Sequence, residues 1–466
     1  MRGYVGQGRP AASPFSRRGR WLWGASLRTS NVGFLLVLVL VLLTPAGGRS
    51  ADPVDPAGSS KPDIKLMRPE GPSFKISLDE AVALFLKQNL DLLITHYGID
   101  FAKGQQITAS LFPNPVLSVG TLGSLANNQP LGRTGQVYPQ IQQLFEMAGK
   151  RGYRIESAAY GTQSAEASFE DAIRQLAFTV KDTYFRVQLA ARRLALAEEN
   201  RDRFARILEV NTIRFKKGYI AEVDLIRIRL QVVDFQSQVI QAIQDGNAAR
   251  ADLRVLLSLS ATTAIALTTE LEYRPVEPDI VTLRRVALET RPDIRVRRLT
   301  QAQRAADLKL ARAYRIPDIT AGTGLAVQGS RGPDNPTQLG FSLGIPLPLF
   351  NRNQGGIAQA EVSVQMAEAD LNKTLVQAEN QVEIAYRNLV ESRRLVEAYR
   401  AGVLDDARST LTIVERAYER GGATILDLLD AARTSRTIQQ NYIETLYSYQ
   451  RNVFLLESAV GREFAS

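Results

Sequence analysis

The sequence predicts a mainly helical fold with a small β part, in which one unit of helix, strand hairpin, very long helix and helix is used twice. Three segments of the first half recur in the same order about 204 residues later, which indicates a duplication. Proline is absent from 140–274 and 349–466, and these gaps permit long helices because an interior proline breaks a helix. Two charge-free stretches, 114–132 and 335–351, predict the strands.

The first 51 residues are predicted to be a signal peptide. They hold seven arginines and no acidic residue, an apolar run at 32–43 and a small-residue region at 46–51, which is the layout of an export signal. Removing this leader lowers the formal charge from +9 to +2, so no basic footprint for a nucleic acid is left. Residues 52–73 contain five prolines and are expected to form a flexible periplasmic lead.

A membrane location would have to come from strands. The run at 32–43 is the longest apolar run of the chain, and it falls short of the roughly 20 residues that a membrane-spanning helix needs. Cysteine is absent, which excludes disulfides, thiolate metal sites and a lipid on an N-terminal cysteine.

The two copies of the unit are predicted at 74–260 and 282–466, joined by a linker at 261–281. The opening helix is expected to end near Pro113 in the first copy and near Pro317 in the second. The matching segments are Ser77–Leu84 with Thr282–Leu288, Leu144–Arg151 with Leu349–Gly356, and Gly218–Leu225 with Gly421–Leu428.

The long helix of the first copy is expected to run from about Lys150 to Ile213, which at 1.5 Å per residue is roughly 96 Å. Its apolar residues are spaced by three and four positions, which is typical of a coiled coil. The stripe consists of Ile173, Leu176, Val180, Tyr184, Val187, Ala191 and Leu194. An ordinary helical bundle explains the same stripe equally well.

The strands favour a membrane β-barrel. Residues 338–349 place apolar side chains at every second position, with small or polar residues between them, and 319–327 alternate in the same way. This is the pattern of a strand that faces lipid on one side. Four strands per chain are fewer than the roughly eight with which bacterial barrels begin, so several chains would have to close one barrel together. A soluble hairpin with one buried face remains an alternative.

The chain resembles the TolC-like outer-membrane efflux family, and in particular its members that serve cobalt-zinc-cadmium exporters. The resemblance covers about 74–466, and its strongest markers are the segments 346–355 and 149–151. It implies a homotrimer in the outer membrane of a Gram-negative bacterium, with a shared barrel and a periplasmic helical tunnel. It also implies docking on a periplasmic adaptor (membrane fusion) protein and an inner-membrane RND pump. Part of the family carries an acylated N-terminal cysteine, which is missing here.

The turns after the long helices are candidates for adaptor docking. Lys217 and Gly218 interrupt the first helical pattern and Gly421 and Gly422 interrupt the second; glycine lets a helix end and reverse because it tolerates φ > 0. A simple hairpin corner is the alternative interpretation.

A gate is predicted from acidic residues beyond the second turn. Asp427 and Asp430 lie on one helix face, and around a threefold axis they would form two acidic rings suited to passing cations. Helix-end acids that only favour the local dipole are the alternative. The family resemblance adds Tyr418 and Asp224 to a gating network, but Ala423 stands where the family motif has arginine, which puts a latch of the same design in doubt.

The junctions between strands and long helices contain cationic and glycine residues that are expected to lie at the periplasmic membrane edge, with Lys150, Arg151 and Arg352 reaching toward the interface. The junction residues are Gly149, Lys150, Arg151, Phe350, Asn351 and Arg352.

The sequence contains no phosphate-binding loop, no paired-histidine spacing and no nucleophile with a histidine partner, so we expect a passive duct and not an enzyme. No cofactor and no resident metal are expected, because one histidine, four methionines and no cysteine cannot make a selective soft-metal site. The expected function is passive export of heavy-metal cations. The alternatives are a drug or type I protein-secretion channel and, from another class, a soluble periplasmic coiled-coil scaffold.

Overall fold

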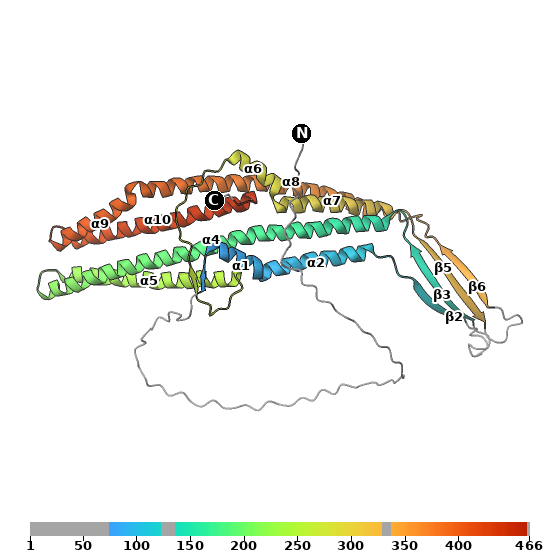
Figure 1. Cartoon of the computed structure of the whole chain (residues 1–466), viewed down its shortest axis with the longest axis horizontal. Coiled ribbons are helices and arrows are strands. Elements are labelled where there is room, and N and C mark those ends of the chain that lie inside the picture. The colour runs from blue at the N-terminus through green and yellow to red at the C-terminus, as the bar shows by residue number, and fades with distance from the viewer. Residues whose placement is uncertain (1–73, 123–135, 329–336, 464–466) are drawn as a thin grey trace, which may run out of the picture. The chain divides into compact units, whose positions relative to one another are not determined.

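The computed structural model describes residues 74–122, 136–328 and 337–463, all within one unit of the chain, Arg68–Ser466 (Figure 1). The expected signal peptide (1–51) and proline-rich lead (52–73) lie outside the described residues. Helices dominate and the strands are few, which confirms the mainly helical class with a small β part.

The order of elements is the same in both halves. The first half contains β1 (Phe74–Ile76), α1 (Leu78–Gln88), α2 (Leu90–Ser110), β2 (Val116–Leu122), β3 (Gln136–Phe145), α4 (Lys150–Lys216) and α5 (Glu222–Leu256). The second contains β4 (Ile265–Leu267), α6 (Ile280–Thr290), α7 (Pro292–Ala313), β5 (Ile319–Gln328), β6 (Gln338–Gly344), α8 (Gln354–Ala398), a π-helical turn (Tyr399–Val403), α9 (Leu404–Glu419) and α10 (Ile425–Val460).

The prediction of one opening helix per half was wrong, because each is divided into two. Asn89 has extended backbone angles and its side chain accepts a hydrogen bond from the Leu92 N–H, so it ends α1 and begins α2. In the second half Arg291 precedes Pro292, and the proline ring disfavours helical angles at the residue before it.

The long helices of the two halves also differ. α4 is uninterrupted over 67 residues, which at 1.5 Å per residue is about 100 Å. The corresponding stretch of the second half is broken between α8 and α9, where Gly402 has φ +128°. Glycine tolerates this angle because it has no Cβ.

Four strands form one antiparallel sheet in the order β2-β3-β5-β6. The register pairs Leu117 with Ile141, Ile141 with Thr323, and Thr323 with Phe341. Since side chains alternate between faces along a strand, this register gathers most of the apolar residues of the four strands on one face, although Val116, Leu122 and Leu144 lie on the other. The apolar face includes Leu117, Val119, Ile141, Phe145, Leu325, Val327, Leu339, Phe341 and Leu343. The other face carries Ser118, Gln140, Gln142, Thr320, Gly322, Gly324 and Ser342.

The last strand is shorter than the alternation at 338–349 predicts. β6 ends at Gly344, the last residue paired with β5. Pro346 and Pro348 follow, and proline cannot donate a ladder hydrogen bond. No described helix is both long and apolar enough to cross a membrane.

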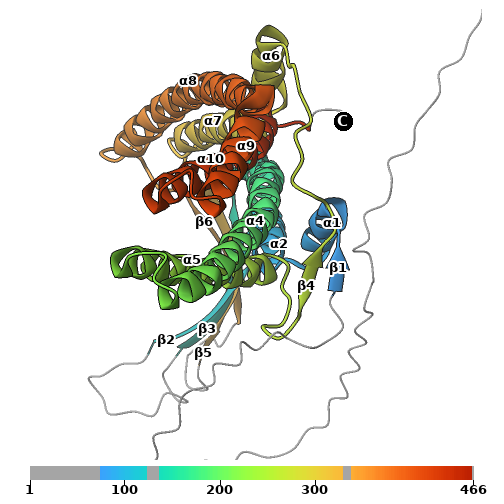
Figure 2. The same cartoon turned by 90° about the vertical axis from the view of Figure 1, so that its left-hand side faces the viewer.

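Two buried tyrosines join the linker to the long helices. Tyr184 in α4 donates to the Ile76 carbonyl (3.0 Å) and accepts from the Thr269 N–H (3.0 Å). Tyr449 in α10 donates to the Arg274 carbonyl (2.8 Å). These bonds fix the parallel pair of β1 and β4, which lies beside α1 in Figure 2, against the main hydrophobic core.

The break between α6 and α7 is held by a buried arginine. The Nε and Nη2 atoms of Arg291 donate to the two oxygens of the Asp293 carboxylate, at 3.0 and 2.7 Å. The same group donates to the Ala459 carbonyl and to Gln381 Oε1, each at 2.8 Å. Burial would raise the pKa of Asp293, but the bonds from Arg291 outweigh burial and lower it.

We therefore expect Arg291→Ala to lower the free energy of unfolding by about 3–5 kcal/mol, because it leaves a half-buried carboxylate and two acceptors unpaired. Denaturant unfolding of the detergent-extracted chain, followed by circular dichroism, measures the change. Arg285→Ala, an exposed arginine of α6, is the matched control and should stay within about 0.5 kcal/mol of the wild type. Equal loss in both variants would contradict a structural role for Arg291.

Candidate functional site

The two helix turns, α4–α5 and α9–α10, have the same geometry. Gly218 (φ +75°) and Gly421 (φ +78°) both take left-handed angles. The Tyr219 N–H donates to the Arg214 carbonyl at 2.9 Å, and the Gly422 N–H donates to the Ala417 carbonyl at 2.8 Å. These bonds satisfy carbonyls that the helix ends leave free.

The turns lie at the end of the helices remote from the four-stranded sheet (Figure 1). The predicted docking residues Lys217, Gly218, Gly421 and Gly422 are all exposed there. Adaptor docking at these turns stays a prediction.

Tyr418, near the end of α9 and close to the α9–α10 turn, joins the two halves. Its hydroxyl donates to Asn211 Oδ1 at 2.7 Å, which links α9 to α4. The Arg214 guanidinium lies 5.9 Å from the centre of the Tyr418 ring and donates to the Glu419 carbonyl at 2.8 Å. Burial raises the pKa of Tyr418, and the Asp224 carboxylate adds to that rise, whereas Arg214 and Asn211 oppose it.

Asp224 and Tyr418 line one hollow of about 650 Å³, together with Arg214, Arg227 and Ala423. The Asp224 carboxylate lies 3.4 Å from Arg227 of the same helix. The structure thus brings two of the four predicted gate residues, Asp224 and Tyr418, into one hollow, while Asp427 and Asp430 lie outside its lining. The arginine that the family motif has at the position of Ala423 is missing, but Arg214 of the first half supplies a guanidinium to the same place.

The two predicted acidic residues have different roles in the helix. Asp427 forms a capping box with Thr424: the Thr424 N–H donates to Asp427 Oδ2 at 2.8 Å, and the Asp427 N–H donates to Thr424 Oγ1 at 3.2 Å. The hydrogen bonds from Thr424 lower the pKa of Asp427. Asp430 is exposed one turn later and lines a hollow with Arg433 and Arg436. Asp427 therefore caps the helix, and a gating role for Asp427 and Asp430 stays a prediction.

Two further ion pairs tie the first half to the second, and the sequence reasoning missed both. Arg203 in α4 lies 3.2 Å from Glu415 in α9, and Arg436 in α10 lies 3.3 Å from Asp234 in α5. Asp234 and Arg436 are separated by about one repeat length, so opposite charges at matching positions of the two copies were an available signal for this pair. Arg203 and Glu415 do not match in the repeat, and no such signal existed for them.

The junction after β3 corrects one prediction. Lys150 is 2% exposed, so it does not reach toward a membrane interface. Its Nζ lies 2.6 Å from Asp318 Oδ1 and donates to the Ile316 carbonyl at 2.7 Å. Asp318 Oδ1 also accepts from the Met147 N–H at 2.9 Å. A buried charge needs a partner, and Asp318 at the start of β5 provides it.

The other junction residues lie nearer the surface. Gly149 takes φ +71° at the start of α4, and Asn353 takes φ +58° at the start of α8. Arg151 donates from Nε to the Ser110 carbonyl at 2.7 Å. Phe350 is 91% exposed, and the exposed Asn351 and Arg352 follow it. An interfacial role for Arg352 stays a prediction.

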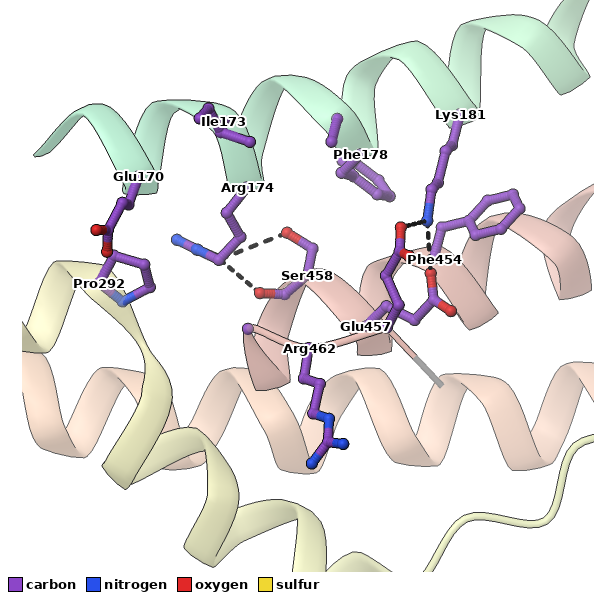
Figure 3. A pocket seen from close by; sticks show the side chains of 13 residues that line it. Glu170, Ile173, Arg174, Phe178, Lys181, Pro292, Phe454, Glu457, Ser458 and Arg462 are labelled. Carbon is purple, nitrogen blue, oxygen red and sulfur yellow. Dashed lines mark hydrogen bonds and ion pairs between the residues drawn. The ribbon is translucent and has the colours of Figure 1, made fainter. Parts of the chain in front are cut away.

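A separate hollow of about 250 Å³ lies between α4, the start of α7 and the end of α10 (Figure 3). Lys181 lies 3.0 Å from Glu457 and 2.5 Å from Glu463, and Arg174 donates to the Ser458 carbonyl at 2.6 Å. Burial would lower the pKa of Lys181, but the two carboxylates outweigh it and raise the pKa. These contacts fasten the end of α10, and we assign them a structural role.

Among the described residues no group of three or more histidine, cysteine, aspartate or glutamate side chains could hold a metal ion. The geometry at the helix turns therefore offers links between helices and exposed acids.

Comparison with known protein families identifies the family of this chain. A model described as "Outer membrane efflux protein" matches residues 86–258 and 283–462, one segment in each half. The chain belongs to the outer membrane efflux protein family. It is an outer-membrane efflux channel with a long periplasmic extension, and as such a passive duct and not an enzyme. The resemblance noted from the sequence is thereby confirmed.

Individual relatives span most of the chain. The cobalt-zinc-cadmium resistance protein CzcC of Cupriavidus metallidurans is 25% identical over 83% of this chain and 90% of its own. The outer membrane protein TolC of Escherichia coli is 26% identical over 69% of this chain and 68% of its own. The Campylobacter jejuni CmeC outer membrane channel has a similar fold, with a TM-score of 0.72, 18% identity and coverage of 82% of this chain and 85% of that one.

We predict that the start of α10 loosens only in acid. Because the folded pKa of Asp427 lies below its ordinary value of 3.8, the cap stabilises the helix fully above that value and is lost as pH falls through the folded pKa. The protection factors of the amides at 425–430, which correct for the intrinsic pH dependence of exchange, should therefore stay high at neutral pH and fall below about pH 4. In Thr424→Ala, which removes the cap partner, protection should be low throughout. A wild type with low protection at neutral pH would contradict the cap.

Proposed function

We propose that this channel is the trimeric exit duct of a tripartite efflux system and that it exports heavy-metal cations delivered by an inner-membrane RND pump and a periplasmic adaptor protein. Family membership removes the soluble periplasmic scaffold as an alternative. Export of drugs or of proteins by a type I system remains the rival within the family. The observation that supports the proposal most directly is that the helices and strands of a single chain form an open array with two unpaired edges.

Near the sheet, α2 packs on α4, α4 on α7 and α7 on α8. The strands that connect these helices follow the order β2-β3-β5-β6. The array of helices and strands is therefore bounded on one side by α2 and β2 and on the other side by α8 and β6. Such an array has two different edges, and contact between unlike edges generates a ring when the rotation closes.

The edges carry the surfaces that such a ring would bury. The outer stripe of α2 exposes Leu90, Ile94, Tyr97, Phe101 and Ile107. The helix at the other edge, α8, exposes Val362, Met366, Val376 and Ile384. Three copies of a four-stranded sheet would close a barrel of twelve strands, above the roughly eight at which bacterial barrels begin. Lipid would then contact the apolar face of the sheet.

The proposed gate lies where α4 and α5 meet α9 and α10. The Tyr418–Asn211 hydrogen bond and the ion pairs Arg203–Glu415 and Arg436–Asp234 all join the first helix pair to the second. Movement of one pair away from the other would break all three. We propose that these contacts hold the closed tunnel and that the adaptor releases them.

The acidic residues support a cation as the substrate. Asp430, and Asp427 beyond its capping role, would repeat around a threefold axis as rings of negative charge, which concentrate cations. The similarity to CzcC, a cobalt-zinc-cadmium resistance protein, supports metal cations among the possible cargoes. With few soft ligands in the chain, the choice of metal would be made by the pump.

The subunit contact is tested by Phe101→Asp. Phe101 is 70% exposed on the outer stripe of α2, and a carboxylate there would be desolvated in the proposed contact. We expect native mass spectrometry of the detergent-extracted variant to find monomers where the wild type is a trimer. Tyr219→Asp, equally exposed but at the α4–α5 turn, should remain a trimer. Trimers of unchanged stability in Phe101→Asp would sink this arrangement.

Single-channel conductance in a planar bilayer tests the duct and its gate together. We expect the wild type to open rarely and to prefer cations, and Asp427→Ala/Asp430→Ala to lose that preference. Tyr418→Phe combined with Arg203→Gln should open more often, because it removes two links between the helix pairs. Arg186→Gln, which breaks an ion pair with Asp252 inside the first pair, is the matched control. Unchanged cation preference in Asp427→Ala/Asp430→Ala would refute the acidic rings, but it would not contradict the proposal that the protein forms a duct.

A further inference from the structure

The junction between β3 and α4 contains a hollow that the efflux function does not use. It encloses about 450 Å³, within the range of small-ligand sites. Phe112, Pro113 and Asn114 line it from the connection after α2, and Phe145 and Arg151 line it from the other side. Aromatic rings and a cation thus meet at one place on the surface.

Arg151 is held in a fixed orientation in this hollow. Its guanidinium lies 4.1 Å from the centre of the Phe112 ring, and its Nε donates to the Ser110 carbonyl. Stacking and one hydrogen bond leave the two terminal nitrogens for a further acceptor. A planar guanidinium presented in this way matches the oxygen atoms of a phosphate group.

The neighbouring charges make the hollow cationic. Glu146 also lines it, but both carboxylate oxygens of Glu146 bond the guanidinium of Arg154. Lys150 is paired with Asp318. Lys150 and Arg154 are thus each paired with a carboxylate, whereas Arg151 forms no ion pair with a carboxylate of the described residues.

The hollow adjoins the end of the apolar sheet face. Phe145 is the last residue of β3, lies on that face by register with Ile319 and lines the hollow as well. A molecule with an anionic head in the hollow could therefore lay hydrocarbon chains along the apolar strands.

The second half of the chain has the same junction without this chemistry. By the correspondence of the two repeats, Gly356 stands where Arg151 stands, Asn351 where Glu146 stands and Ile316 where Phe112 stands. The fold forms in both halves, so it does not require the arginine, the carboxylate and the ring.

We propose that this hollow binds the phosphodiester headgroup of a membrane phospholipid, with Arg151 as the phosphate ligand and Phe112 as the residue that orients it. The inference rests on the proposed function only in taking the apolar face of the sheet to be the lipid-facing one. Each protomer would hold one lipid at the periplasmic edge of the sheet.

Native mass spectrometry of the full-length, delipidated protein in detergent tests this, with phosphatidylglycerol as the probe. We expect saturable binding to the wild type and a dissociation constant about tenfold higher for Arg151→Gln, since one charge-assisted contact of about 1.4 kcal/mol is lost. Arg352→Gln, an exposed arginine at the second junction, is the matched control and should bind as the wild type does. Circular dichroism checks that the helices remain.

Two competitors identify the source of the phosphate. Diacylglycerol, which has the chains without the phosphate, should bind weakly and without dependence on Arg151. Inorganic phosphate should not displace the lipid at equal concentration. Equal affinity of the wild type and Arg151→Gln for phosphatidylglycerol would overturn the proposal, as would displacement by free phosphate or Arg151-dependent binding of diacylglycerol.

If Arg151→Gln does not fold, Arg151→Lys serves instead and should bind with intermediate affinity, because lysine keeps the charge and loses the planar fork. Affinity equal to the wild type in Arg151→Lys would refute recognition by the guanidinium. Binding is measured without conductance, so a failure here leaves the duct intact. Trimers of unchanged stability in Phe101→Asp, in turn, would refute the proposed subunit contact and leave the headgroup contact to be judged on its own.

Discussion

Backbone hydrogen bonding is the constraint on which the architecture depends. Inside a bilayer, an N–H or carbonyl group without a partner costs several kcal/mol, so a sheet there cannot keep open edges. In the described sheet of this chain, β2 and β6 each have a neighbour on one side only. The helices α2 and α8 continue these edges into the periplasmic part. In the proposed trimer, one chain is a segment of a closed wall, and duplication of the unit supplies a segment wide enough for a few copies to complete it.

The joint between sheet and helices explains how such a segment keeps its shape. Lys150 begins α4 in the first half, and its partner Asp318 precedes β5 in the second. A buried ion pair adds little net stability but is costly to break, so it fixes the position of one hairpin relative to the other. At the far end, the Tyr418–Asn211 hydrogen bond and the ion pairs Arg203–Glu415 and Arg436–Asp234 join the halves. The two halves are therefore fastened to each other at both ends.

Local patterns predicted the elements, and tertiary packing decided the rest. Alternation at 338–344 and the glycines at 218 and 421 identified a strand and two turns, because each depends on the backbone preferences of nearby residues. The break at Arg291 was also encoded locally, in the proline that follows it, and was overlooked. The burial of Lys150 and the contact of Tyr418 with Asn211, 207 residues away, were beyond such patterns. Both depend on which helices of the two repeats become neighbours.

The glycine at the break between α8 and α9 gives the two halves different mechanical properties. An uninterrupted α4 resists bending along its whole length and acts as a strut. The second long helix has one joint, at Gly402, where no side chain fills the space around the backbone. A rod with a single joint concentrates its bending there, so bending of this helix would change the angle between α8 and α9. Two copies of one ancestral unit have in this way diverged into a rigid member and a hinged one.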